Sequence, residues 1–262
     1  MKNIRAIMYN NVGDYPTAAM EDGMLPQAFA RDMAWLSENR YRVVSLSDAM
    51  AMAEGSTPLA DQLLTLTFDG GYRDASEYVA PILSKLGFPA TFFVALPDLG
   101  SSLTVGGMAS PCMDIDGARG LIASGFSLGA YLLGGRIYHE TMQDDLIREI
   151  DEAVSFFSSQ LQVPLEYVSV REGIPGKAVR TVLQSHGIKG FLTKCPTKQR
   201  PHPYCIGRIQ IDDDDPNIFR VKISKNYLRF KDSRIWPYMR KYRLDRLAHR
   251  ISDTINARRD GA

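Results

Sequence analysis

The sequence predicts an α/β fold in which parallel strands close into a barrel. Short apolar runs alternate with helical patterns over most of the 262 residues, and such alternation is typical of βαβ units that build a parallel sheet. The sequence contains no internal repeat and no low-complexity linker, so all of these units are expected in one domain. This many units in one domain favour a closed barrel over an open sheet, with reactive groups at the carboxyl ends of the strands.

The elements can be placed along the chain from the period of their apolar residues. Short apolar runs predict strands, which we expect at residues 4–9, 41–46, 63–68, 90–96, 125–133, 165–170 and 188–193. Phe29, Met33 and Leu36 recur with the spacing of one helical face. Further helices are expected at residues 47–54, 75–86, 144–161 and 177–186. Residues 97–116 are rich in glycine and serine, and they predict a long loop at the mouth of the barrel.

Composition and charge exclude several classes of protein. The formal net charge of +1 gives no general attraction to polyanions, and no pattern of basic and aromatic residues indicates nucleic-acid binding. No run approaches the roughly 18 apolar residues of a transmembrane helix, and the first residues lack the apolar region of a secretory signal. Three cysteines without a CxxC pair are too few for a disulfide framework. We therefore expect a cytoplasmic protein.

The end of the sequence carries a local excess of positive charge. Residues 219–262 contain 13 Lys or Arg against 4 Asp. Within them Leu244, Leu247 and Ile251 make a helical apolar stripe that basic residues flank. Such a helix either packs on the barrel with a solvated cationic face or lies on an anionic membrane surface. The second interpretation predicts peripheral membrane contact through residues 236–262.

Three stretches of the sequence carry a resemblance to a known family. They are FARDMAWLSENRYRVVSLSDAM, LLTLTFDGGYRD and YVAPILSKLGFPATFFV. Together they resemble the polysaccharide deacetylases of carbohydrate esterase family four, in particular the branch that acts on exopolysaccharides built on N-acetylglucosamine. The resemblance implies a distorted (β/α)7 TIM-like barrel over residues 1–225. The charge and apolar period of the remaining residues predict a basic C-terminal helical extension at residues 226–262.

The resemblance also indicates where the family's metal ligands would fall. The first family motif is T-F-D-D-G, in which the first Asp is a general base and the second binds a divalent metal such as zinc. Here Asp69 keeps the first position and Gly70 replaces the second. The two histidines of the next motif, H-[ST]-x-x-H, fall on Tyr131 and Gly135 in GFSLGAYLLGG. All three protein ligands of the family metal are therefore replaced.

The loss of these ligands removes the main source of hydroxide. A catalytic zinc-type site needs about three protein ligands, and its ion lowers the pKa of water from about 15.7 to about 7. That change corresponds to roughly 12 kcal/mol, whereas a general base contributes only about 10²–10⁴-fold. Asp69 remains the candidate base but cannot replace the ion. We therefore expect no cofactor and a catalytically degenerate protein.

Other residues of this region are candidates for carbohydrate binding. Tyr131 can donate a hydrogen bond to a sugar. Arg171 lies in SVREGIPG, which resembles the third family motif with its glycine at either Gly173 or Gly176, and it can pair with Asp69. Arg208 lies in YCIGRIQI, at the arginine position of a family strand.

Three functional hypotheses follow from these observations. The first is a metal-free homologue of bacterial surface or exopolysaccharide metabolism that binds a carbohydrate or supports an assembly complex. The second is an active carbohydrate N-deacetylase, a hydrolase of C–N amide bonds, with a rebuilt site for which His139 and His202 are candidates. The third is a membrane-peripheral adaptor that uses residues 236–262.

Overall fold

The fold is taken from a computed structural model of the chain. It describes residues 4–14, 23–55, 62–105, 108–194, 202–224 and 227. The chain divides into two units, Met1–Asp212 and Asp213–Ala262. In the second unit the structure describes helix α7 (Pro216–Ile223), whose first turn is capped by the Asp215 side chain. The membrane-contact hypothesis concerns residues 236–262, which lie outside the described residues.

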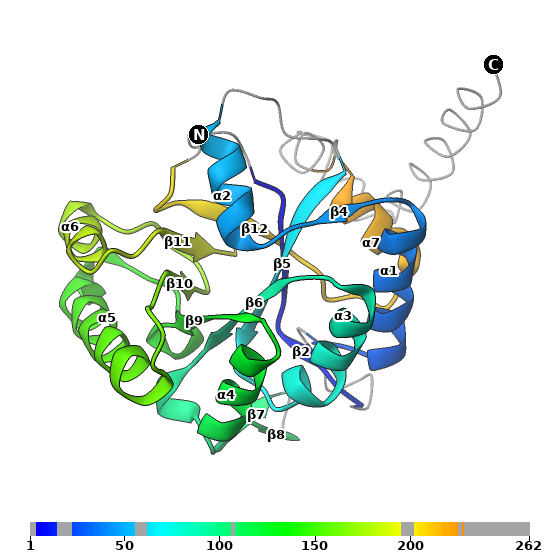
Figure 1. Cartoon of the computed structure of the whole chain (residues 1–262). Coiled ribbons are helices and arrows are strands. Elements are labelled where there is room, and N and C mark those ends of the chain that lie inside the picture. The colour runs from blue at the N-terminus through cyan, green and yellow to red at the C-terminus, as the bar shows by residue number, and fades with distance from the viewer. Residues whose placement is uncertain are drawn as a thin grey trace. The chain divides into compact units, whose positions relative to one another are not determined.

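Seven parallel strands close the barrel of the first unit (Figure 1). Their order is β1, β12, β11, β10, β9, β6 and β5, and β5 pairs again with β1. The bounds are β1 (Ala6–Tyr9), β5 (Leu63–Gly70), β6 (Ala90–Val94), β9 (Ser127–Tyr131), β10 (Tyr167–Val170), β11 (Gly190–Thr193) and β12 (Ile206–Gln210). The short strand β4 (Arg42–Val43) pairs with the start of β5. The predicted (β/α)7 barrel is confirmed.

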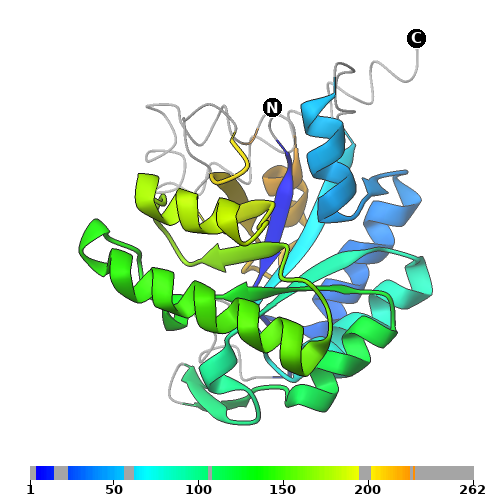
Figure 2. The same cartoon turned by 60° about the vertical axis from the view of Figure 1, so that its left-hand side comes forward.

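Helices cover the outside of this barrel (Figures 1 and 2). They are α1 (Pro26–Glu38), α3 (Ala80–Leu86), α4 (Ile115–Ala123), α5 (Gln143–Phe156) and α6 (Lys177–Ser185). A π-helical turn precedes α3 and another follows α5, so the helices expected at 75–86 and 144–161 are present at nearly those bounds. The predicted apolar face of α1 is fully buried at Phe29, Met33 and Leu36.

Aromatic side chains fill the space between the first strands and the helices. Tyr9, Phe68 and Phe92 are register partners on β1, β5 and β6, and their rings stack with centroid distances of 5.2 and 4.8 Å. Phe29 of α1 meets Tyr9 and Phe68 edge-on. Because side chains alternate along a strand, their neighbours Thr67 and Asp69 face the interior of the barrel.

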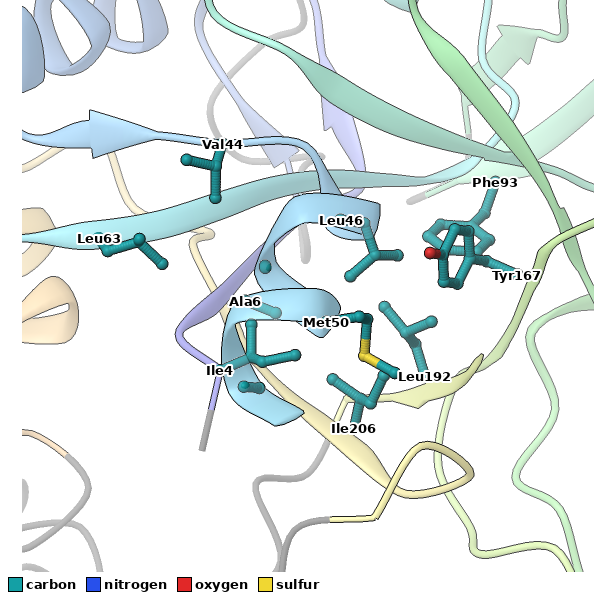
Figure 3. Close-up of a cluster of buried hydrophobic side chains, with 12 residues drawn as sticks. Ile4, Ala6, Val44, Leu46, Met50, Leu63, Phe93, Tyr167, Leu192 and Ile206 are labelled. Carbon is teal, nitrogen blue, oxygen red and sulfur yellow. The ribbon is translucent and has the colours of Figure 1, made fainter. Parts of the chain in front are cut away.

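Helix α2 (Leu46–Glu54) closes the amino end of the barrel. Ser45 caps it by accepting a hydrogen bond from the backbone N–H of Asp48, which satisfies one of the free donors of the first turn. Figure 3 shows Leu46 and Met50 directed toward Phe93, Tyr167, Leu192 and Ile206, which belong with them to one buried cluster. One end of the interior is therefore apolar and sealed, and the polar residues lie toward the other.

The segment expected to be a long loop contains a β-hairpin instead. Strands β7 (Ser102–Val105) and β8 (Met108–Pro111) pair antiparallel, so the predicted long loop over residues 97–116, which connects β6 to α4, carries secondary structure that the sequence analysis did not expect. A second small sheet pairs β2 (Asn11–Val12) with β3 (Gly23–Met24). Among the described residues, no helix has both the length and the apolar character needed to cross a membrane.

Candidate functional site at the carboxyl ends of the strands

A buried ion pair lies at the centre of the site. Asp69, near the end of β5, is 2% exposed, and Arg208 of β12 is 0% exposed. Nη1 of Arg208 donates to Oδ1 of Asp69 and Nη2 donates to Oδ2, each over 2.6 Å. This two-pronged contact is the strongest geometry for a guanidinium and a carboxylate, and it occupies both oxygens of Asp69.

Neighbouring strands hold this pair in place. Ser169 of β10 donates from Oγ to Asp69 Oδ1 over 3.2 Å. Thr67 lies 3.4 Å from Arg208 Nη1 and donates its own proton to the carbonyl of Ile7 over 2.8 Å. The guanidinium carbon of Arg208 is 5.4 Å from the centre of the Phe93 ring, within the range of a cation–π contact. Asp69 and Arg208 are thus neutralised and fixed by β1, β5, β6 and β10.

Tyr131, at the end of β9, is half-buried beside this pair. Burial raises the pKa of its hydroxyl most, and the charge of Asp69 raises it further. The positive charges of Arg208 and Arg171 act in the opposite direction. The net pKa lies above the ordinary range, so the hydroxyl stays protonated at neutral pH and remains a hydrogen-bond donor.

The residues at the expected metal-ligand positions do not fit a metal ion. Gly70 has φ +99°, and a Cβ placed on it would lie 2.4 Å from Cε2 of Tyr72. A Cβ on Gly135 would lie 3.2 Å from the Tyr131 hydroxyl oxygen. In the part of the chain that the structure describes, no group of three His, Cys, Asp or Glu is placed to hold a metal. Of the three positions, only Tyr131 offers an oxygen, and that oxygen is protonated.

The third-motif region forms the turn after β10. Arg171 is exposed and near enough to Tyr131 to affect its pKa, and its carbonyl accepts a hydrogen bond from Lys194 N–H over 2.9 Å. Gly173 has φ +120°, and a Cβ there would lie 2.7 Å from Cβ of Tyr138. Gly176 is the N-cap of α6. Of the two candidate glycines of the third motif, Gly173 thus lies in a tight turn and Gly176 lies at the start of a helix.

A second buried carboxylate connects the loops at this end of the barrel. Asp74 is 5% exposed, and its Oδ2 accepts a hydrogen bond from Val12 N–H over 2.6 Å. Burial raises the pKa of Asp74 to about 7, although the hydrogen bonds from Val12 and Ala75 oppose this change. Asn11, next to Val12, donates to Ser110 of β8 over 3.4 Å. Asp74 therefore ties the segment after β1 to the segment after β5.

The structure brings together most of the candidates named from the sequence, together with residues that the sequence did not reveal. Asp69 pairs with Arg208, not Arg171 as the sequence allowed, and Tyr131 lies beside them. Ser169 was missed, although it lies on a strand that the sequence predicted, where alternation places it on the same face as Tyr167.

The two histidines considered for a rebuilt site have local roles. His139 is exposed and precedes a short 3₁₀ turn. His202 accepts a hydrogen bond at Nδ1 from Tyr204 N–H over 3.1 Å, in the turn before β12.

Comparison with known sequences identifies the family. A family profile described as polysaccharide deacetylase matches residues 56–191, just over half of the chain. An 87-residue segment is 33% identical to the poly-beta-1,6-N-acetyl-D-glucosamine N-deacetylase of Escherichia coli K12. That segment is 33% of this chain and 13% of the relative, so the chain spans a small part of that protein's length.

Solved structures show the same fold. The structure of IcaB from Ammonifex degensii superposes with a TM-score of 0.71 at 16% identity, covering 85% of this chain and 97% of the other. The Streptococcus pyogenes deacetylase PplD, in complex with acetate, gives a TM-score of 0.69 at 17% identity, covering 84% and 98%. The shared barrel agrees with the sequence match. The protein belongs to the polysaccharide deacetylase family.

Proposed function

We propose that the protein is a metal-free deacetylase homologue of bacterial surface or exopolysaccharide metabolism. In this proposal it binds a glycan at the carboxyl end of the barrel and does not hydrolyse the acetamide group. The relationship to an enzyme that acts on poly-β-1,6-N-acetyl-D-glucosamine makes oligomers of that sugar the first ligands to test.

The observation that carries the proposal is the state of Asp69. A general base needs a carboxylate oxygen that can reach the proton it accepts. Both oxygens of Asp69 are engaged by Arg208 at 2.6 Å, and the carboxylate is 2% exposed. Gly70 and Gly135 have no side chains to hold a metal-bound water near it. The arrangement favours a structural ion pair over a catalytic base.

Binding groups remain beside the pair. A tyrosine hydroxyl is protonated at neutral pH, and burial and the nearby Asp69 charge raise the pKa of Tyr131 further, so this hydroxyl can donate to a sugar hydroxyl or carbonyl. Arg171 is exposed at the turn after β10. Hydrogen bonds from a few fixed polar groups are the usual means by which a pocket orients a polar ligand.

Metal content and acetate release test the absence of hydrolysis. Purified protein is expected to hold far less than one equivalent of zinc, nickel or cobalt, and to release no acetate from N-acetylglucosamine oligomers with or without added metal. The poly-beta-1,6-N-acetyl-D-glucosamine N-deacetylase of Escherichia coli provides a positive control for the acetate assay. Acetate release that Asp69→Asn abolishes would instead establish an active enzyme with a rebuilt site.

Direct binding tests the glycan ligand. Isothermal titration with acetylated and deacetylated β-1,6-linked glucosamine oligomers is expected to give a measurable Kd for at least one of them. Arg171→Met is expected to weaken it, whereas Arg148→Met, in an exposed ion pair on α5, should leave it unchanged. Absence of binding to every oligomer would contradict the proposed function.

A further inference from the structure

We propose that Tyr72 and Tyr131 form an aromatic sugar-binding subsite where the family's metal-ligand side chains have been lost. In this subsite the Tyr72 ring packs against one face of a pyranose and the Tyr131 hydroxyl donates a hydrogen bond to it. The inference rests on the proposed function and adds to it the residues that contact the glycan.

The ring of Tyr72 packs against the backbone of Gly70. With φ +99°, Gly70 adopts a conformation that residues with a side chain rarely take. An added Cβ would lie 2.4 Å from Cε2 of Tyr72, 3.0 Å from Cδ2 and 3.1 Å from Cζ. The ring therefore covers the α-carbon of Gly70, in the space that any side chain at this ligand position would need.

Backbone contacts on both sides hold Tyr72 in this position. Tyr72 forms an isolated antiparallel bridge with Cys112. Its neighbours are tied to the same segment, because Arg73 N–H donates to the carbonyl of Pro111 and Met113 N–H donates to the carbonyl of Gly71, each over 2.9 Å. Because the backbone that carries the ring is fixed, less conformational entropy is lost when a ligand packs on the ring than on a side chain of a mobile loop.

Tyr131 takes the corresponding space at the other lost ligand position. Its hydroxyl oxygen lies 3.2 Å from the place of a Cβ on Gly135. Tyr72 and Tyr131 are near enough that Tyr72 contributes to the raised pKa of Tyr131. Both side chains are half-buried, so each leaves part of its surface open to solvent at the carboxyl end of the barrel.

The chemistry of the two side chains suits a sugar ring. A pyranose has apolar C–H faces and a polar rim, and a tyrosine offers an apolar ring with a hydroxyl at its tip. The adjacent Asp69 is neutralised by Arg208, which leaves no net charge from this pair to favour a bare cation. A neutral, amphipathic ring therefore matches the subsite better than a metal ion does.

Binding measurements on Tyr72 variants test the inference. For the glycan oligomer that the wild-type protein binds, Tyr72→Ala and Tyr72→Leu are expected to weaken Kd by about tenfold or more, a change of about 1.4 kcal/mol. Tyr72→Phe keeps the ring and should stay within about threefold. Tyr41→Ala is the matched control. Tyr41 packs on Trp35 and precedes β4, which pairs with the start of β5, so it lies away from the site at the end of β5. Circular dichroism and Tm identify any variant that fails to fold, and Tyr72→Leu retains bulk if Tyr72→Ala fails.

The outcomes separate this inference from the proposed function. If the wild-type protein binds no glycan, the proposed function itself is wrong. If it binds and folded Tyr72→Leu binds equally well, the aromatic subsite is wrong while glycan binding stands. If Tyr72→Phe loses as much affinity as Tyr72→Leu, the hydroxyl and not the ring makes the contact, which also overturns the inference.

Discussion

At the scale of single residues, Asp69 and Arg208 depend on each other. Two charges removed from water cost much desolvation energy, and only close pairing with additional hydrogen bonds offsets it. Ser169 and Thr67 supply such bonds here. A residue that is the family's candidate base is therefore also part of the structural interior of this barrel.

Removal of Arg208 is expected to destabilise the protein strongly. Arg208→Leu leaves the Asp69 carboxylate buried without its partner, and such a change costs about 3–5 kcal/mol. Urea unfolding monitored by circular dichroism measures the loss. Arg148→Leu breaks an exposed pair with Asp145 and should cost at most about 1 kcal/mol. Equal losses for the two variants would show that the buried pair carries no special weight.

Asp74 is expected to make the stability of the fold depend on pH. Its pKa is about 7 in the folded protein against an ordinary value of 3.8, so between these values the folded state binds more protons than the unfolded state. The contribution is therefore fully stabilising below about pH 4 and is lost as the pH rises through 7. The total change is on the order of 4 kcal/mol.

Asp74→Asn removes this titration while keeping an oxygen for the Val12 N–H. Relative to the wild type, the variant is expected to gain stability progressively from pH 4 to pH 8. Free energies of unfolding from urea titrations across this range measure the effect, with Asp116→Asn, at an exposed position, as control. Parallel pH profiles for wild type and Asp74→Asn would contradict the prediction.

At the scale of elements, strand β9 has no room for a side chain at Gly129, where the Phe93 ring packs against its backbone. A Cβ on Gly129 would lie 2.5 Å from Cε1 of Phe93 and 2.6 Å from the carbonyl oxygen of Tyr167. Phe93 in turn packs under Arg208. Gly129 thus permits the packing of Phe93 that supports the ion pair.

Gly129→Ala is therefore expected to be destabilising by about 1–3 kcal/mol, the usual range for overpacking. Gly120→Ala provides the opposite case, since Gly120 lies within α4 with nothing within 4 Å of an added Cβ. That change should stabilise the helix by up to about 1 kcal/mol. Thermal unfolding of both variants checks that Gly129→Ala lowers stability and that Gly120→Ala raises it. A Gly129→Ala variant as stable as the wild type would show that Phe93 can move freely.

The hairpin β7–β8 illustrates why one element escaped the sequence analysis. Glycine and serine in residues 97–116 hide any apolar period, so composition indicates a loop. The pairing of Ser102–Val105 with Met108–Pro111 comes from backbone hydrogen bonds, which carry little signature in side-chain hydropathy. Helix α1, by contrast, was predictable because its buried face repeats with the helical period.

At the scale of the whole molecule, the membrane hypothesis for residues 236–262 makes a simple prediction. The full chain is expected to float with liposomes that contain anionic lipid, because apolar and basic residues alternate there with the period of an amphipathic helix. The chain truncated after residue 235 should remain unbound, and high salt should weaken flotation of the full chain. Flotation that is unchanged by the truncation would sink the hypothesis.

The sequence by itself determined the alternation of strands and helices and the family, and it predicts that Gly70, Tyr131 and Gly135 stand at the family's metal-ligand positions. These are local properties, because periodicity and motif spacing depend on residues close in the chain. Only the tertiary structure decided that Arg208 rather than Arg171 pairs with Asp69, 139 positions away, and that Tyr72 covers Gly70. The register of the strands and the closure of the barrel bring those side chains together. Local sequence patterns do not predict which residues meet across a closed barrel.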